Sequence, residues 1–235
     1  HADHIVTGSA FSKREIIRYL HVPKDKVTVV PNAVDHAVYH AGYKESEIQN
    51  VLQKYHIEKE YLLYLGTIEP RKNLERLIGA YHRLHQEKKD LPQLVLAGKK
   101  GWLCDGIYKK VQDLHLGQKV VFTGYIDPQD SPVLLCGAKI FLFPSLYEGF
   151  GMPPLEAMAC GTPVIVSNTT ALPEVVGDAG IAVDPGSEQD LCKAVKKLLE
   201  DPVCLDRLGR MATERAKQFT WANAAKMLMD VYRKV

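Results

Sequence analysis

The stretch YLLYLGTIEPRKNLERLIGAYHRL, Tyr61 to Leu84, contains a strand, a loop and a helix in succession. Its first five residues form a continuous apolar run, which is typical of a strand buried on both faces of a sheet. The helix has Asn73 as its expected N-cap, and its apolar residues follow at helical spacing: Leu74, Leu77, Ile78, Tyr81 and Leu84. The stretch therefore predicts one unit of a parallel sheet with a helix packed on it.

Further apolar runs of the same kind follow, separated by helical patterns. The predicted strands are Gln93–Ala97, Lys119–Thr123, Lys139–Phe143, Pro163–Ser167 and Gly180–Asp184. An alternation of buried strands and helices indicates an α/β fold with a doubly wound parallel sheet, which is a Rossmann-like arrangement.

The two ends of the chain differ from this central part. Residues 1–40 predict another strand–helix–strand piece, and residues 41–60 a polar connection with helical content. The C-terminal part is helical, with predicted helices at 188–199, 203–218 and 221–233. The apolar face of the last helix is expected to consist of Trp221, Ala225, Leu228 and Val231.

The composition is that of a globular protein with nearly balanced charge. Its 235 residues include 30 basic and 28 acidic ones, a formal charge of +2, without a long block of like charge. Binding of nucleic acid through a basic arm is therefore not expected. The five cysteines are odd in number and scattered, which is typical of reduced thiols in the cytoplasm.

Neither a membrane span nor a signal peptide is recognisable. No apolar run approaches the roughly 20 residues that cross a bilayer, and the first residues lack the apolar core of a signal peptide. The sequence begins without a methionine, within a strand-like pattern. We therefore expect a cytoplasmic protein of which this chain is a part.

Glycine, charged and turn-forming residues follow the predicted strands. The segments are GTIEPRKN (66–73), GKKGW (98–102), GYID (124–127), PSLYEGFGMPPLE (144–156) and NTTALPE (168–174). In an open parallel sheet, ligands bind beyond the carboxyl ends of the strands. These segments therefore predict a pocket of nucleotide size at one edge of the sheet.

The segment GTIEPRKN has the features of a diphosphate-binding loop. Gly66 lets the backbone approach a ligand, while Arg71 and Lys72 place two cations beside the positive end of the helix that begins near Asn73. The alternative is a basic turn whose side chains are solvated, since arginine and lysine are usually exposed.

The segment EGFGMPPLE holds two glutamates eight residues apart. Pro153 and Pro154 suit the first turn of a helix that begins near Met152, and its free backbone donors, with those of 149–151, predict an anion site. Glu156 is expected in the first turn of that helix, where an acid has an ordinary structural role. Glu148 lies in the glycine loop and is the stronger functional candidate.

Other chemical motifs are weak or missing in the sequence. There is no phosphate loop ending in Gly-Lys-Ser/Thr, and His36 and His40 lack the further ligands of a zinc site. We expect no metal in the site. Two nearby carboxylates also suggest a glycosidase pair, but placing Glu148 on a loop and Glu156 on a helix favours two separate binding roles.

Several segments together resemble the retaining glycosyltransferases of family 4, also called group 1, which have the GT-B architecture of two facing Rossmann-like domains. The most specific is EGFGMPPLEAMACGTPVIVSNTTALPEVVGDAGIAVDP (148–185), which is similar to the family's Glu-x7-Glu signature. LGTIEPRKN (65–73), VTVVPNAVD (27–35) and FTWANAAKMLMDVY (219–232) resemble its diphosphate loop, linker entry and terminal helix.

The resemblance divides the chain into three parts. Residues 1–40 would be the end of an N-terminal acceptor domain and the linker entry, 41–219 the nucleotide-sugar-binding domain, and 220–235 a helix that crosses back toward the first domain. The acceptor site would lie in a preceding domain. The chain would then be the donor-binding part of the enzyme and incomplete for catalysis.

The resemblance also implies roles for individual residues. Arg71, Lys72 and Glu148 would be catalytic, with Lys72 on the donor diphosphate and Glu148 on the donor sugar. Glu156 would bind the ribose. The donor-binding set would be Gly66, Thr67, Gly124, Tyr125, Ile126, Ser145, Gly149, Phe150, Gly151, Met152, Pro153, Leu155 and Glu156. Thr67 stands where many members have an arginine, so Arg71 would supply the second cation, and Ala33 replaces a usual glycine.

The implied reaction is transfer of a hexose from a nucleoside diphosphate sugar to a hydroxyl of a glycan or lipid-linked acceptor, with retention of configuration and without a cofactor. The EPRKN variant suggests GDP-mannose as the donor and polysaccharide biosynthesis as the setting. The full-length protein could contact the inner face of the membrane. Two alternatives stay open: a nucleotide-sugar 2-epimerase of the same architecture, and a non-catalytic nucleotide-binding or scaffolding domain.

Overall fold

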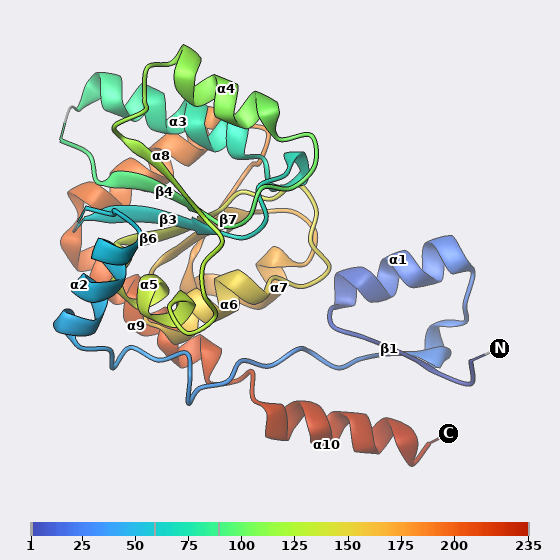
Figure 1. Cartoon of the computed structure of the whole chain (residues 1–235). Helices are drawn as coiled ribbons and strands as arrows, with labels where there is room; N and C mark the ends of the chain where they lie inside the picture. The colour runs from blue at the N-terminus through green and yellow to red at the C-terminus, as the bar shows by residue number, and fades with distance from the viewer. Residues whose placement is uncertain (1, 59, 89, 235) are drawn as a thin grey trace.

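The computed structural model describes residues 2–58, 60–88 and 90–234. The outer ends of the predicted segments 1–40 and 220–235 therefore lie outside the described residues. A six-stranded parallel sheet with helices on both faces forms the main body (Figure 1). A two-stranded sheet with one helix, and a C-terminal helix, lie to one side of this body (Figure 1).

The main sheet confirms the predicted doubly wound α/β fold. Its strands run in the spatial order β5-β4-β3-β6-β7-β8, and every neighbouring pair is parallel. Their bounds agree with the predicted ones to within a residue: β3 Tyr61–Leu65, β4 Gln93–Ala97, β5 Val120–Gly124, β6 Ile140–Phe143, β7 Val164–Ser167 and β8 Ile181–Val183. The strand order reverses between β3 and β6, which makes this point the expected ligand crevice.

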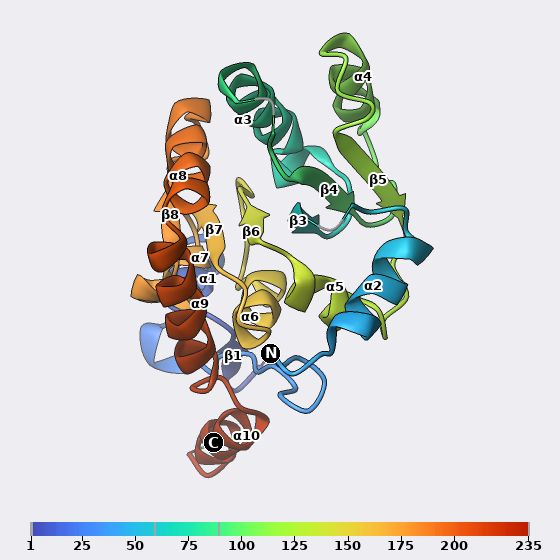
Figure 2. The ribbon, with the colours of Figure 1, turned by 90° about the vertical axis from the view of Figure 1, so that its left-hand side faces the viewer.

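The helices cover both faces of the sheet (Figure 2). One face carries α3 (Leu74–Glu87), α4 (Asp105–Asp113) and α8 (Glu188–Glu200), which pack on one another. The other carries α2 (Glu45–Lys54), α5 (Ser131–Gly137), α6 (Met152–Ala159), α7 (Leu172–Val176) and α9 (Pro202–Ala216). Short 3-10 turns occur at η1 (Lys24–Lys26), η2 (Pro70–Lys72) and η3 (Gly177–Ala179).

Large apolar side chains from the strands fill the core between these layers. Tyr61, Tyr64, Phe141 and Phe143 are fully buried. The tyrosine hydroxyls keep partners there, because Tyr61 donates to the Leu134 carbonyl oxygen at 2.6 Å and Tyr64 to that of Thr67 at 2.9 Å. Burial of such side chains, at about 1.5–3 kcal/mol each, is the main source of stability for the sheet.

The N-terminal piece has the predicted strand–helix–strand form. It consists of β1 (Ile5–Thr7), α1 (Ala10–Leu20) and β2 (Val27–Val29), and the two strands are paired in parallel. The chain then passes to α2 through residues 30–44. The C-terminal helix α10 (Trp221–Tyr232) lies beside this piece rather than on the main sheet (Figure 1).

The predicted apolar face of α10 is wrong in part. Val231 is buried and Leu228 half-buried, but Trp221 is 62% exposed and Ala225 is exposed. The helix turns Ala224 toward the rest of the chain instead. The helical period shows which residues share a side of α10, but not where the rest of the chain lies. The packing of the chain decided which side of the helix is buried.

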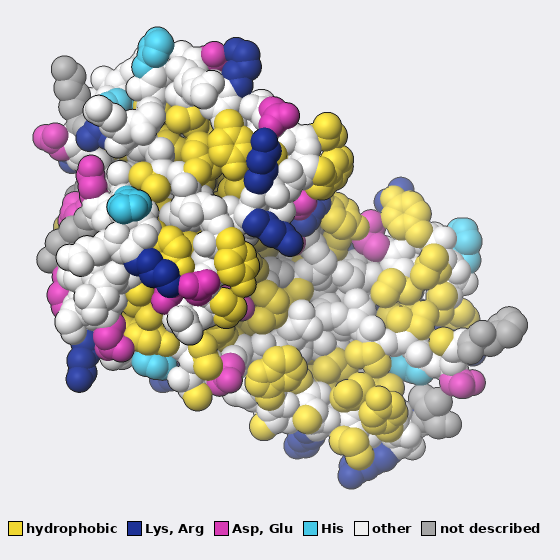
Figure 3. All heavy atoms as spheres, viewed as in Figure 1, with side chains coloured by type: hydrophobic (Ala, Val, Ile, Leu, Met, Phe, Trp, Pro, Cys, Tyr) yellow, Lys and Arg dark blue, Asp and Glu magenta, His cyan; other side chains and the backbone are white. Residues whose placement is uncertain are grey.

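Hydrophobic side chains gather on the surface over α1 and α10 (Figure 3). The exposed ones are Tyr19, Leu20, Trp221, Met227, Met229 and Tyr232. Among the residues that the structure describes, no helix has the length and apolar character needed to cross a membrane.

Glycines close the carboxyl ends of β3, β4 and β5. The Gly66 N–H donates to the Ala97 carbonyl oxygen and the Gly98 N–H to that of Gly124, both at 2.9 Å. Gly98 has a φ of +144°, and a Cβ atom there would collide with the Gly66 carbonyl oxygen. The backbones at this edge are therefore too close for side chains, which leaves main-chain atoms facing the crevice.

Gly98→Ala is expected to lower the free energy of unfolding by about 3 kcal/mol, since the strained φ costs about 1–3 kcal/mol before the collision is counted. The control is Gly117→Ala, because nothing lies within 4 Å of a Cβ atom at Gly117. That substitution should stay within about 0.5 kcal/mol of the parent chain. Urea unfolding measures both, and equal losses would contradict the close approach of the two loops.

Candidate functional site

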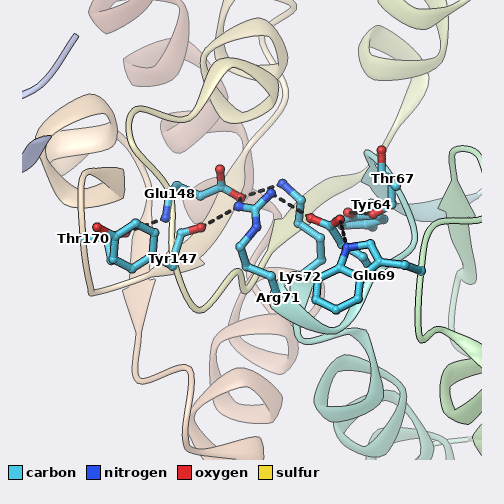
Figure 4. Close-up of polar contacts among 9 residues, drawn as sticks. Tyr64, Thr67, Glu69, Arg71, Lys72, Tyr147, Glu148 and Thr170 are labelled. Atoms are coloured by element: carbon cyan, nitrogen blue, oxygen red, sulfur yellow. Dashed lines mark hydrogen bonds and ion pairs between the residues drawn. The ribbon is translucent and has the colours of Figure 1, made fainter. Parts of the chain in front are cut away.

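The loops after β3 and β6 meet at the point where the strand order reverses. Lys72, at the end of η2, donates from Nζ to Glu148 Oε1 at 2.6 Å. Arg71 forms an ion pair with the same carboxylate oxygen at 2.9 Å. Figure 4 shows both cations converging on Glu148. The structure therefore brings together the three side chains that the sequence analysis singled out as catalytic.

The two cations differ in their surroundings. Lys72 is buried, and its Nζ atom lies 4.8 Å from the centroid of the Phe143 ring. The Arg71 side chain is 41% exposed and also contacts Glu69 Oε1 at 2.8 Å and the Tyr147 carbonyl oxygen at 2.6 Å. Lys72 is thus enclosed by the protein, whereas Arg71 has more hydrogen-bond partners but exposes part of its side chain to an incoming anion.

Asn73 stands at the predicted N-cap position of α3 but does not cap it. Its backbone is left-handed, with φ of 61°, and its side chain accepts no backbone N–H of the first turn, only the Arg76 guanidinium at 3.2 Å. Its amide donates instead to the carbonyl oxygens of Pro144 and Pro185, at 3.1 and 2.9 Å. Asparagine tolerates this conformation, and here its buried amide joins the loops after β3, β6 and β8.

The start of α6 differs from the prediction in two ways. The helix begins at Met152, as expected, with Gly151 at the N-cap. Glu156 is the fifth helical residue and lies beyond the first turn, so the first-turn role predicted for it is wrong. Two of the first three helical residues, Pro153 and Pro154, have no N–H, so α6 itself offers few free donors.

The anion site predicted here is therefore made by the glycine loop. The backbone N–H groups of Gly149, Phe150, Gly151 and Met152 donate to no group in the described part of the chain. Gly151 adopts φ of +126°, which only glycine takes without strain. Successive free N–H groups in a turn form a concavity suited to an anion, and they lie beside the Lys72–Glu148 pair.

A cavity of about 360 Å³ opens at the same sheet edge. Six predicted donor-binding residues line it: Gly66, Thr67, Tyr125, Ile126, Pro153 and Glu156. Further lining residues, which the sequence analysis did not single out, include Tyr39, Gly98, Lys99 and Ser131. The GKKGW segment gave a signal for Gly98 and Lys99, because it follows a strand at this edge. Tyr39 precedes α2, and no sequence signal marked it.

Glu156 is the acidic residue of this cavity. Burial raises the pKa of its carboxyl above the ordinary value, and the nearby Tyr39 hydroxyl acts in the opposite direction. An acid whose pKa is raised in this way carries a free-energy cost when it is ionised in the folded chain. A group kept at such a cost is a candidate for binding a ligand.

Three predicted donor-binding residues have a different position. Leu155 is fully buried in the core, and its N–H bonds to the Gly151 carbonyl oxygen, so its side chain is closed to a ligand. The Phe150 side chain packs on Phe219, at 6.0 Å between ring centroids, and lines a separate cavity between α1 and α10. The Ser145 hydroxyl is buried without a hydrogen-bond partner in the described chain.

The N-terminal piece contacts the glycine loop directly. The hydroxyls of Ser9 and Ser12 donate to the Gly149 carbonyl oxygen at 2.7 and 3.0 Å. The carboxylate of Glu174 accepts from the N–H groups of Ala10 and Phe11, both at 2.7 Å, at the N-terminus of α1. These contacts tie the glycine loop and Glu174 to the start of α1.

No group of three or more His, Cys, Asp or Glu residues in the described ranges is placed to hold a metal ion. That the site works without a metal stays a prediction.

The fold is that of one half of a GT-B glycosyltransferase, with its polar loops at the carboxyl edge of a parallel sheet. Residues 46–219 match the family described as Glycosyl transferases group 1. This match covers most of the chain, so the chain belongs to that family.

The relatives of the chain include two mannosyltransferases of Escherichia coli. The O-antigen chain mannosyltransferase B is 37% identical over 230 residues, which are 97% of this chain and 60% of that protein. The serotype-specific mannosyltransferase WbdA is 35% identical over 238 residues, which are 100% of this chain and 29% of that protein. The chain spans less than two thirds of the length of these relatives.

Solved structures show the same fold. The sucrose-phosphate synthase of Thermosynechococcus elongatus has a TM-score of 0.85 at 26% identity, over 100% of this chain and 58% of that one. The Anabaena Alr3699/HepE protein, solved with UDP and glucose, has a TM-score of 0.89 at 21% identity, over 100% of this chain and 64% of that one.

Glu156→Gln is expected to raise the thermal unfolding midpoint at pH 7. The folded chain holds the Glu156 proton more tightly than the unfolded one, so Glu156 costs stability as the pH rises from the ordinary glutamate pKa through the raised one. Glutamine removes this cost, and the two chains should converge below the ordinary pKa of about 4.3. Thermal unfolding at several pH values measures this, and a difference independent of pH would contradict it.

Proposed function

We propose that the chain binds a nucleoside diphosphate sugar and forms the donor half of a retaining hexosyltransferase. One observation carries this proposal. Two cations, Arg71 and Lys72, converge on Glu148, the residues that follow it, 149–152, have free backbone N–H groups, and the next helix carries Pro153 and Glu156 into a cavity. A diphosphate bound by these cations and N–H groups would place its nucleoside in the cavity and its sugar beside Glu148.

Binding of the diphosphate would exchange one anion for another. In the structure, Glu148 neutralises part of the charge of Arg71 and Lys72. A diphosphate brings more negative charge and accepts from the glycine-loop donors as well. As the bond to the sugar breaks, charge accumulates on the leaving phosphate, and these preorganised donors stabilise it.

Once Glu148 is displaced from the cations, its carboxylate would face the donor sugar. Its backbone is fixed on both sides, since its N–H donates to Thr170 Oγ1 at 3.2 Å and its carbonyl oxygen accepts from the Ala171 N–H at 3.4 Å. We infer that Glu148 positions the sugar and stabilises positive charge at the reacting carbon. Such a role suits a transfer that retains configuration.

The names of the mannosyltransferase relatives support mannose as the transferred sugar, and that of the O-antigen chain enzyme supports a growing polysaccharide as the acceptor. GDP as the nucleotide of the donor rests on the EPRKN segment. The acceptor would bind a domain that precedes this chain, over the exposed apolar surface of α1 and α10 (Figure 3). We place the full-length protein in the cytoplasm, with contact to the inner membrane face through that domain. The predicted boundaries at residues 40 and 219 belong to the same proposal.

Calorimetric titration of the chain with GDP, UDP, dTDP and ADP, each with and without Mg²⁺, tests the proposed donor site. Saturable binding of one diphosphate without Mg²⁺ is expected, and GDP is the expected one. Absence of binding for all four would favour a scaffolding role. Epimerised donor in the full-length protein, formed without an acceptor, would favour an epimerase.

Lys72→Met and Glu148→Gln are expected to change nucleoside diphosphate affinity in opposite directions. Loss of the Lys72 charge removes a charged hydrogen bond worth about 1.5–3 kcal/mol, so affinity should fall at least about tenfold. Glutamine at 148 frees both cations, so affinity should rise about threefold or more. Calorimetry with GDP measures both.

The matched control for these variants is Glu60→Gln, which removes an exposed ion pair with Lys139 at 3.0 Å, away from the site. It should leave the GDP affinity unchanged. Weaker GDP binding by Glu148→Gln would show that Glu148 does not compete with the diphosphate.

A further inference from the structure

The Glu69 carboxylate lies between Arg71 and Trp102, and so joins the loop after β3 to the loop after β4. Its Oε1 atom accepts from Arg71 Nη2 at 2.8 Å, and its Oε2 atom accepts from Trp102 Nε1 at 3.2 Å. Figure 4 shows Arg71 between Glu148 and Glu69. The Glu69 side chain is only 13% exposed. A carboxylate with a separate donor on each oxygen has a fixed plane, so Glu69 is a rigid partner for Arg71.

Trp102 has its place because the two loops run side by side. The Ile68 N–H donates to the Lys99 carbonyl oxygen at 3.0 Å, and the Gly101 N–H donates to the Ile68 carbonyl oxygen at 2.9 Å. Ile68 itself is fully buried, which anchors this pairing in the core. The Trp102 ring is 63% exposed, so burial contributes little to its position. The hydrogen bond from its N–H to Glu69 is therefore the directional contact of this side chain.

The two terminal nitrogens of Arg71 have different partners. Nη2 donates to Glu69, whereas Nη1 donates to the Tyr147 carbonyl oxygen at 2.6 Å and pairs with Glu148 Oε1 at 2.9 Å. In the proposed function the diphosphate displaces Glu148, which removes one of the two carboxylates that hold the guanidinium. The other carboxylate, that of Glu69, stays. Because the guanidinium is planar and rigid, holding Nη2 also fixes the direction of Nη1.

We propose that Glu69 is a positioning residue for the donor diphosphate: with Trp102 on its other oxygen, it keeps the Arg71 guanidinium in place when Glu148 is displaced. This proposal rests on the proposed nucleotide-sugar function. The two acids that contact Arg71 then have different roles. Glu148 competes with the diphosphate for the cation, whereas Glu69 orients the cation toward it.

Glu69→Asp separates the orienting role from the charge. Aspartate keeps the negative charge, but its side chain is one methylene shorter and cannot reach both Arg71 and Trp102. The diphosphate would then have to immobilise Arg71 itself, so affinity should fall about threefold to tenfold, which is the cost of ordering one long side chain. Calorimetric titration with GDP and with UDP measures this. If only the charge of Glu69 mattered, affinity would stay within about twofold of the parent chain.

The two tryptophans of the chain provide a matched pair of variants. Trp102→Phe keeps an aromatic ring but removes the N–H that holds Glu69, so affinity for the diphosphate should fall about threefold. Trp221 lies on α10 and is 62% exposed, nearly the same fraction as Trp102. Trp221→Phe is therefore the control, and it should leave the dissociation constant unchanged.

A further variant shows whether Glu69 acts through Arg71. In an Arg71→Met background, Glu69→Asp should change the dissociation constant no further, because the group that it orients is gone. A merely structural role for Glu69 would instead weaken binding by the same factor in both backgrounds.

The outcomes separate the two proposals. If the parent chain binds neither GDP nor UDP, the proposed function fails and the inference fails with it. If the parent chain binds one of them but either Glu69→Asp or Trp102→Phe keeps the parent affinity, the inference is overturned while the proposed function stands. The same holds if Glu69→Asp has its full effect in the Arg71→Met background. If Glu69→Asp does not fold, the exposed position of Trp102 still allows Trp102→Phe to decide the question alone.

Discussion

The ion pair between Lys72 and Glu148 is the contact on which the site depends. The chain leaves β3 and β6 toward opposite faces of the sheet, so their loops separate and leave a crevice at the carboxyl edge. A buried lysine next to a glutamate from the other loop spans this crevice at 2.6 Å. Since neither charge is well solvated, each requires the other, and the pair fixes the two loops relative to one another.

The same pair explains how an apparently neutral crevice can bind a strong anion. Arg71 and Lys72 are held in place by Glu148 before any ligand arrives, and the glycine loop with its free N–H groups follows Glu148 directly. Groups that are already oriented lose little entropy when a ligand replaces the carboxylate. The contacts of α1 with Gly149 and of Asn73 with Pro144 add to this rigidity from both sides.

The sequence predicted the strands and the loops well, because buried parallel strands appear as continuous apolar runs and their polar loops gather at one edge. It failed where long-range contacts decide the outcome. Asn73 matches the residue type of a helix cap, yet its amide binds carbonyl oxygens 71 and 112 residues away. Leu155 lies within the Glu-x7-Glu segment but packs into the core. Tyr39 lines the cavity although it belongs to no recognisable motif.

The sequence by itself determined the fold class, the strand order along the chain and the two segments that carry Lys72 and Glu148, because hydrophobic period and turn chemistry are local properties. Only the tertiary structure decided that these two side chains pair, that Phe150 turns away from the cavity, and that Tyr39 lines the same cavity as Glu156. Those facts depend on contacts between residues far apart in the chain. Such contacts are set by packing and produce no periodic pattern in the sequence.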